Sequence, residues 1–168
     1  IEHGKDSSEA LIRKYKPSLL ISIERPGKNQ DSRYYNMRGI DITEKCADFD
    51  VFFENASCPK ISIGDGGNEI GMGNVELNLS SLKIKPSTTE CDELLVADVS
   101  NWGAHGLIAM LSTLQNKDYL AAWENDKTLH MLSELGAVDG VSGKRTQTED
   151  GFTSKETKIV INLSLIHI

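Results

Sequence analysis

The chain has 168 residues, of which 39% are apolar, and this is enough for one globular domain with a hydrophobic core. Its formal net charge of −7 would repel a phosphate backbone, which argues against a nucleic-acid partner. No apolar run approaches the roughly 20 residues that cross a bilayer, which argues against a membrane protein.

The first half of the chain predicts helices that alternate with short apolar strands. A helix is expected from about Glu9 to Lys16, with Ser8 as its N-cap and Pro17 at its end. The run Leu19 to Glu24 is nearly continuous in apolar residues, which is typical of a strand covered on both faces. The stretch Arg25 to Asp41 has proline, glycine, asparagine and aspartate without apolar periodicity, and it predicts a long loop.

A second helix and a second strand follow this loop. The helix is expected over Ala47 to Asn55, with Phe49, Phe52 and Phe53 turned inward. The strand Lys60 to Gly64 then leads into the glycine-rich segment GDGGNEIGMGN.

The second half continues the alternation. Leu94 to Val99 predicts a third strand, and a helix begins near Gly103 with Ser100 or Asn101 as its cap. Helical spacing assigns five residues of that helix to a buried face that should pack on the sheet, namely Ala104, Leu107, Ile108, Leu111 and Leu114. A further helix is expected from about Asp118 to Leu135, ended by Gly136, and a last strand over Ile159 to Asn162.

This alternation predicts an α/β fold, a mostly parallel sheet with helices on both faces and Rossmann-like layering. Because the chain begins at Ile1 in what reads as a loop, we expect the domain to be truncated at its N-terminal end. The tail at 163–168, LSLIHI, resembles the translation of a sequencing adapter. We therefore expect one partial domain over residues 1–162.

Polar residues follow all three predicted strands, at the ends where parallel sheets collect ligands. The candidate site residues are Glu24, Arg25, Asp65, Gly66, Gly67, Asn68, Glu69, Ser100, Asn101, Trp102 and His105. Carboxylates, amides and a guanidinium at neighbouring strand ends predict a pocket for a small zwitterion.

The glycine-rich segment lacks the Lys-Ser/Thr pair of a Walker A loop and the G-x-G-x-x-G spacing of dinucleotide folds. Asp65 or Glu69 would face an ammonium group, while the N–H groups of Gly66 and Gly67, or the guanidinium of Arg25 or Arg38, would face a carboxylate. The alternative is a tight turn with solvated acids.

The long loop adds Tyr34, Asn36 and Arg38, which combine a flat ring, an amide and a fork of donors suited to a carboxylate. The alternative is a loop held by aromatic packing. Four other candidates have a plain structural alternative as well: Ser100 and Asn101 as helix caps, Trp102 as a core residue and His105 as a partly buried core residue.

Several segments together resemble the carboxy-terminal domain family of D-glutamate cyclases. They are ISIERPG, RYYNMRG, IGDGGNEIGMGNV, VSNWGAHGL and GAVDGVSG, which span most of the chain up to Gly151. The resemblance implies a hydro-lyase that converts D-glutamate into 5-oxo-D-proline and water, with Asp65 or Glu69 as general base. The isolated fragment is expected to be inactive.

The resemblance also implies a companion, because some animal members join this domain to a separate hydro-lyase-like domain. An alternative function is therefore a non-catalytic amino-acid or anion-binding module beside a catalytic domain. Lactam formation needs no redox cofactor, so no cofactor is expected. The cysteines Cys46, Cys58 and Cys91 have no metal-ligand spacing, so we expect no metal site and reduced thiols in the cytoplasm or the mitochondrial matrix.

Overall fold

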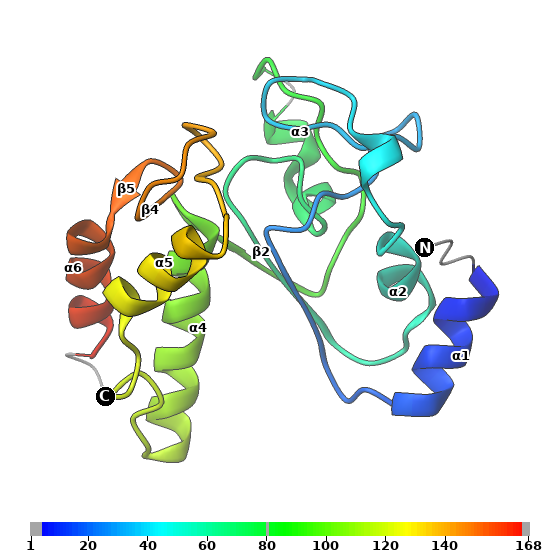
Figure 1. Ribbon diagram of the computed structural model, residues 1–168. Coiled ribbons are helices and arrows are strands. Elements are labelled where there is room, and N and C mark those ends of the chain that lie inside the picture. The colour runs from blue at the N-terminus through cyan, green and yellow to red at the C-terminus, as the bar shows by residue number, and fades with distance from the viewer. Residues whose placement is uncertain (1–4, 80, 166–168) are drawn as a thin grey trace. The chain divides into compact units, whose positions relative to one another are not determined.

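The computed structural model describes residues 5–79 and 81–165. Contacts within the chain divide it into two compact units, residues 1–100 and residues 101–168 (Figure 1). The prediction of a single domain over residues 1–162 stays a prediction.

The first unit contains a parallel three-stranded sheet. Its strands are β1 (Leu20–Ile23), β2 (Lys60–Gly64) and β3 (Glu93–Val96), in the order β1-β2-β3. Ile63 lies opposite Ile23 on one side and Leu95 on the other, and it is fully buried. The sheet and its helices confirm the α/β class with a parallel sheet, and β2 has the bounds that the sequence predicts.

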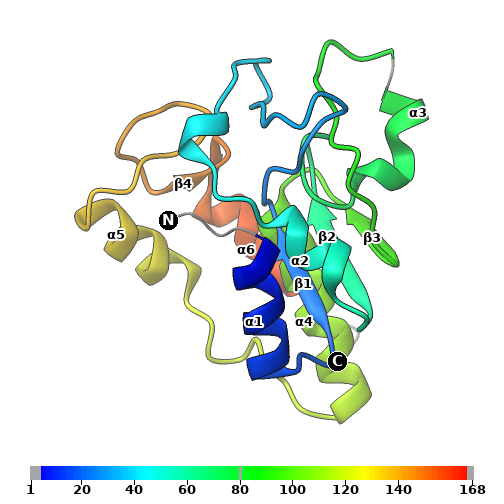
Figure 2. The same ribbon diagram turned by 90° about the vertical axis from the view of Figure 1, so that its right-hand side faces the viewer.

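Three helices and two 3₁₀ turns complete the described part of the first unit. α1 (Lys5–Tyr15) and α2 (Asp50–Asn55) lie side by side (Figure 2). The glycine-rich segment leads into a 3₁₀ turn, η2 (Met72–Val75), and then α3 (Glu76–Leu79), and a second 3₁₀ turn, η1 (Thr43–Lys45), lies in the long loop.

Three details of the first unit differ from the sequence prediction. α1 begins before Ser8, whose buried hydroxyl accepts a hydrogen bond from the Asn55 side chain, so Ser8 ties α1 to α2 rather than capping a helix. β1 is not covered on both faces, because Ile21 and Ile23 are 46% and 47% exposed. Phe49 precedes α2 and is 38% exposed, so it does not turn inward. The guanidinium of Arg25 packs over its ring.

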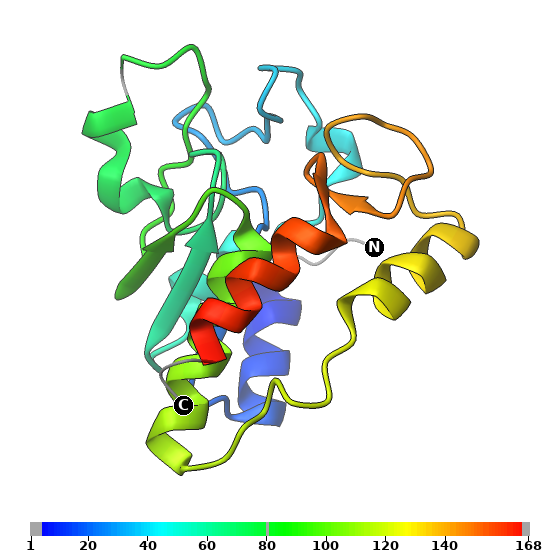
Figure 3. The same ribbon diagram turned by 90° about the vertical axis from the view of Figure 1, so that its left-hand side faces the viewer.

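The second unit is mostly helical. Its helices are α4 (Ser100–Gln115), which begins at the last residue of the first unit, α5 (Asn125–Glu134) and α6 (Ser154–Leu165). A short hairpin, β4 (Thr148–Glu149) and β5 (Phe152–Thr153), leads directly into α6 (Figure 3). Ala109, Leu120 and Ile161 form its small apolar core.

The strand predicted over Ile159 to Asn162 is wrong, because these residues lie inside α6. The Thr153 N–H and hydroxyl both donate to the Glu156 carboxylate, which caps the start of the helix. The tail begins within α6 and its last residues, 166–168, lie outside the described part of the chain.

The predicted faces and bounds of the other two helices also need correction. Leu111 and Leu114 are 41% and 80% exposed, whereas His105, Ala109 and Ser112 are buried. α5 starts at Asn125 rather than near Asp118, because the Asp118 carboxylate accepts the N–H groups of the next turn. The expected left-handed glycine at the end of α5 is confirmed, since Gly136 has φ +98°.

Candidate functional site

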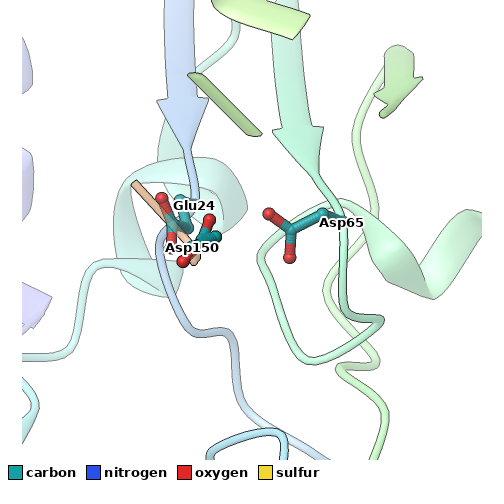
Figure 4. Close-up of side chains that lie close together, drawn as sticks. All are labelled: Glu24, Asp65 and Asp150. Carbon is teal, nitrogen blue, oxygen red and sulfur yellow. The ribbon is translucent and has the colours of Figure 1, made fainter. Parts of the chain in front are cut away.

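The carboxyl ends of the parallel strands bring two acids of the first unit together. Glu24 follows β1 and Asp65 follows β2, and a carboxylate oxygen of one lies within 4.8 Å of a carboxylate oxygen of the other. Figure 4 shows both side chains beyond the tips of their strands. Glu24 has a left-handed backbone, with φ +53°, and its N–H donates to the carbonyl of Ile63. Two carboxylates at this distance form a locally negative site that favours a cationic group such as an ammonium.

Asp65 also holds the start of α4. Its Oδ2 accepts hydrogen bonds from the Ser100 N–H at 2.9 Å and from the Ser100 hydroxyl at 2.8 Å. Asp65, and not Ser100 or Asn101, therefore caps this helix end. Within the described residues, its Oδ1 accepts no hydrogen bond, and the half-buried side chain leaves this oxygen for a ligand.

Glu69 lies inside the glycine-rich loop and is only 3% exposed. Its Oε1 accepts the N–H of Gly66 at 2.9 Å, and its Oε2 accepts the N–H of Gly67 at 2.8 Å. Burial raises the pKa of this carboxyl and the nearby charge of Asp65 adds to the effect, while the loop N–H groups oppose it. The loop N–H groups that were expected to face a ligand carboxylate therefore donate to Glu69 instead.

Asn68 joins the glycine-rich loop to the long loop. Its Nδ2 donates to the carbonyl of Tyr35 at 2.9 Å. Its Oδ1 is buried and has no hydrogen-bond partner among the described residues. The amide therefore fixes the relation of the two loops within the first unit.

The long-loop candidates are used mainly inside the protein. The buried Tyr34 hydroxyl donates to Asp50 at 2.8 Å and to Asp48 at 3.2 Å, and burial raises its pKa. Asn36 Oδ1 accepts the N–H groups of Arg38 and Ile40 and so closes a turn. Tyr34 and Asn36 therefore hold the loop together, which is the alternative to ligand binding, whereas the side chain of Arg38 is exposed.

Arg25 points toward α2. Its guanidinium donates to the carbonyl of Ala47 at 3.0 Å and lies 4.5 Å from the centre of the Phe49 ring. The Nε atom is buried without an acceptor among the described residues. The guanidinium therefore has no contact with Asp65 or Glu69 in the described hydrogen bonds and ion pairs.

Asn101 and Trp102 belong to a partly buried polar network of the second unit, and His105 is a buried residue of the same unit. Asn101 Nδ2 donates to Glu149 at 2.7 Å, and the Trp102 indole donates to Thr157 at 3.0 Å. His105 is 6% exposed and packs beside the Trp123 ring, with 5.6 Å between ring centres. Burial lowers its pKa, and the charge of Glu149 opposes this effect.

Sequence reasoning missed three buried acids. Asp50 is fully buried and accepts from the Lys28 N–H, the Tyr34 hydroxyl and the Thr89 hydroxyl. Glu149 accepts from Asn101, Asn125 and Thr157. These partners lie far apart in the sequence, so no local pattern indicates them.

The third missed acid, Asp139, had a signal in the sequence. Its carboxylate accepts the N–H groups of Val141, Ser142 and Gly151 and the Thr148 hydroxyl, and the N–H bonds lower its pKa. An aspartate ahead of a glycine in GAVDGVSG is typical of a turn in which the side chain accepts the following N–H groups.

The first unit also has a cavity of about 510 Å³, and neither Glu24 nor Asp65 lines it. It is lined at the amino ends of β2 and β3, by Lys60 and Asp92 among others, and by Lys28 of the long loop. Ligands of parallel sheets bind at the opposite, carboxyl ends, so we place the candidate site at Glu24 and Asp65 on chemistry rather than on cavity size.

Two comparisons with known proteins point to the same family. The model of the family described as D-glutamate cyclase-like, C-terminal, matches residues 2–164. The chain is 36% identical over 103 residues to the human protein named D-glutamate cyclase, mitochondrial. That match covers 56% of this chain and 17% of the human protein, so the chain spans a small part of its relative's length. Among the described residues, no helix has the length and apolarity that a membrane span requires.

Proposed function

Because the chain belongs to the D-glutamate cyclase-like, C-terminal family, we propose that it acts on D-glutamate and converts it into 5-oxo-D-proline and water. The observation that supports a reaction of this kind most directly is the pair of carboxylates at the strand ends, Glu24 and Asp65, within 4.8 Å of each other. Such a pair suits a substrate that carries an ammonium group.

In this reaction the α-amine attacks the γ-carboxyl carbon, a C–N bond forms, a C–O bond breaks and water leaves. Holding both groups of one molecule close together supplies much of the rate, since the attack is intramolecular. The amine must first lose a proton. We assign that step to Asp65, because its Oδ1 has no partner among the described residues, and we assign the recognition of the ammonium to Glu24 and Asp65 together.

Glu69 then acts as a positioning residue. Its carboxylate is occupied by the N–H groups of Gly66 and Gly67, and it fixes the loop that follows Asp65. Arg38, whose side chain is exposed, is the candidate for the substrate carboxylates within the first unit.

The test is to incubate the 168-residue chain, and any longer polypeptide that contains it, with D-glutamate or L-glutamate and to follow lactam formation by NMR. We expect 5-oxoproline from the D-enantiomer with a longer polypeptide that contains the chain, and no product from the 168-residue chain alone. An Asp65→Asn variant should lose at least about 100-fold in rate, the usual contribution of a general base. Absence of lactam from every form of the protein would overturn the proposal.

A second variant separates the two roles of Asp65. Ser100→Ala removes the hydroxyl that donates to Asp65 but keeps the carboxylate and the N–H donor. If Asp65 acts in the reaction, Ser100→Ala should retain most of the rate that Asp65→Asn loses. Equal losses in both variants would mean that Asp65 only holds the start of α4.

A second candidate function is a non-catalytic amino-acid-binding module beside a catalytic domain, which we propose as the alternative. It is favoured by the extent of the match, since the aligned region is 17% of the human relative. Binding of one D-glutamate per chain without lactam formation, in the same NMR experiment, would support this alternative. A fused or partner hydro-lyase-like domain would then carry the reaction.

We also propose the mitochondrial matrix or the cytoplasm as the compartment, and the human relative is named as a mitochondrial protein, which favours mitochondria. Fractionation of cells that express the protein would test this assignment.

A further inference from the structure

β1 is an edge strand whose outer side is unpaired among the described residues. Leu20 donates its N–H to the carbonyl of Pro59, and Glu24 donates its N–H to the carbonyl of Ile63. The backbone N–H and C=O groups of the even-numbered residues of β1 therefore point toward β2. In a parallel strand the next residue along points to the opposite side. The N–H and C=O groups of Ile21 and Ile23 therefore point away from the sheet, toward a free edge.

The side chains at this edge are apolar and unusually open for a parallel sheet. Ile21 and Ile23 are 46% and 47% exposed, although strands of parallel sheets are usually buried on both faces. An exposed apolar edge of this kind readily pairs with another strand.

A groove runs beside the edge. It has a volume of about 430 Å³ and is lined by Ile21, Ile23, Phe49, Phe52, Ile70 and Arg25, among others. All of these residues belong to the first unit. The lining is thus mostly apolar, and its polar residues are Ser22 and Arg25.

Arg25 gives the groove a charge preference. Its guanidinium donates to Ala47 and packs on Phe49, and Arg25 lines the groove. The guanidinium is positively charged, and a carboxylate is its strongest hydrogen-bond partner. The groove therefore favours an occupant that brings a negative charge.

From these observations we propose that the free edge of β1 binds an extended polypeptide segment that has alternating apolar side chains and a carboxylate for Arg25. The segment adds a fourth strand to the sheet, and its main chain pairs with the outward groups of Ile21 and Ile23. Its apolar side chains fill the groove.

The unpaired backbone groups of β1 and the charge of Arg25 favour this occupant over a fatty acid and over a second copy of the chain. A fatty acid would satisfy Arg25, but it would leave the outward N–H and C=O groups of the strand unpaired in an apolar contact. A second copy of the chain in antiparallel register could pair Ile21 with Ile23, but this places Leu19 opposite Arg25 and supplies no carboxylate.

The experiment is amide hydrogen exchange of the ¹⁵N-labelled 168-residue chain with a capped peptide of alternating threonine and valine and a glutamate at each end. A glutamate at both ends tests parallel and antiparallel pairing together. The amides of Leu20 and Glu24, which already donate to β2, are the internal controls. At saturating peptide we expect exchange at Ile21 and Ile23 to slow at least tenfold, with the controls unchanged.

Arg25 is tested with a matched pair of peptides. The same peptide with glutamines in place of the glutamates should bind about tenfold more weakly, the contribution of one charge-assisted hydrogen bond. In an Arg25→Gln variant the two peptides should bind equally.

Three results would overturn the proposal. One is unchanged exchange at Ile21 and Ile23 with saturating peptide. Another is protection by sodium decanoate and not by the peptide, which would mark a lipid site. The third is protection in the free chain together with a dimer mass in sedimentation, which would mean that a second copy covers the edge.

Discussion

Single side chains explain much of how the first unit is held together, and the Tyr34 hydroxyl is the clearest example. It joins the long loop to Asp50, a carboxylate with no exposed surface. The sequence predicted either a ligand role or a packing role for Tyr34. The partner lies 16 residues away in the sequence, so the choice could be made only from the folded chain.

Tyr34→Phe should therefore destabilise the protein by about 1–3 kcal/mol, since a buried carboxylate loses one of its donors. Tyr15→Phe is the matched control, because Tyr15 is 68% exposed and its change should stay within about 0.5 kcal/mol. Urea unfolding of both variants measures the difference. Equal effects would show that the Tyr34 hydroxyl contributes nothing to stability.

Glu69 adds a pH dependence to the stability of the first unit. Its pKa is raised in the folded protein, so the native state binds this proton more tightly than the unfolded chain does. Its contribution to the free energy of unfolding is therefore complete below the ordinary pKa of 4.5 and decreases as the pH rises through the raised value. The nearby charge of Asp65 adds to the rise in the pKa of Glu69 that burial causes.

The prediction concerns the difference between the wild type and Glu69→Gln, because other carboxylates titrate in the same range. The free energy of unfolding of the wild type, minus that of the variant, should decrease as the pH rises from 4.5 toward 7. Urea unfolding at several pH values measures it. A difference that is constant or grows with pH would contradict the raised pKa.

At the scale of elements, the sequence was informative where one pattern excluded the others. β2 could be placed to the residue, because a short apolar run lies between Pro59 and the glycines. α6 was read as a strand because Ile159, Val160 and Ile161 favour strands locally. The better signal was Thr153 followed three residues later by Glu156, which predicts a helix start.

The turn after Glu69 shows why glycine is needed in the loop. Gly71 has φ +96°, and a Cβ there would lie 2.3 Å from the Ser62 Cβ on β2. We expect Gly71→Ala to cost about 3 kcal/mol or more, from backbone strain and overpacking together.

Gly39→Ala is the matched control, because it brings the backbone strain without the steric contact. Gly39 also has a positive φ, +70°, but nothing lies within 4 Å of the added Cβ, so only about 1 kcal/mol of strain is expected. Thermal unfolding of both variants makes the comparison. Similar losses would show that contact with β2 does not matter.

For the whole molecule, composition and the alternation of predicted helices and strands were enough to predict the fold class, and the quoted motifs were enough to identify the family. They were not enough for the site. The candidates fall in two units, with Glu24, Asp65 and Glu69 in the first and Asn101, Trp102 and His105 in the second. Hydrogen-bond partners separate the acids that we propose as ligand-binding groups from those that support the fold, and partners depend on the folded chain.

The placement of Glu69 has a consequence for ligand binding. An internal carboxylate already fills the anion-binding cradle of Gly66 and Gly67, so the glycine-rich loop has its final conformation before any ligand arrives. Association with a small zwitterion then requires little ordering of the backbone, and affinity is limited by side-chain recognition rather than by loop entropy. The cradle is a preorganised support, and a substrate carboxylate must find its own donors elsewhere.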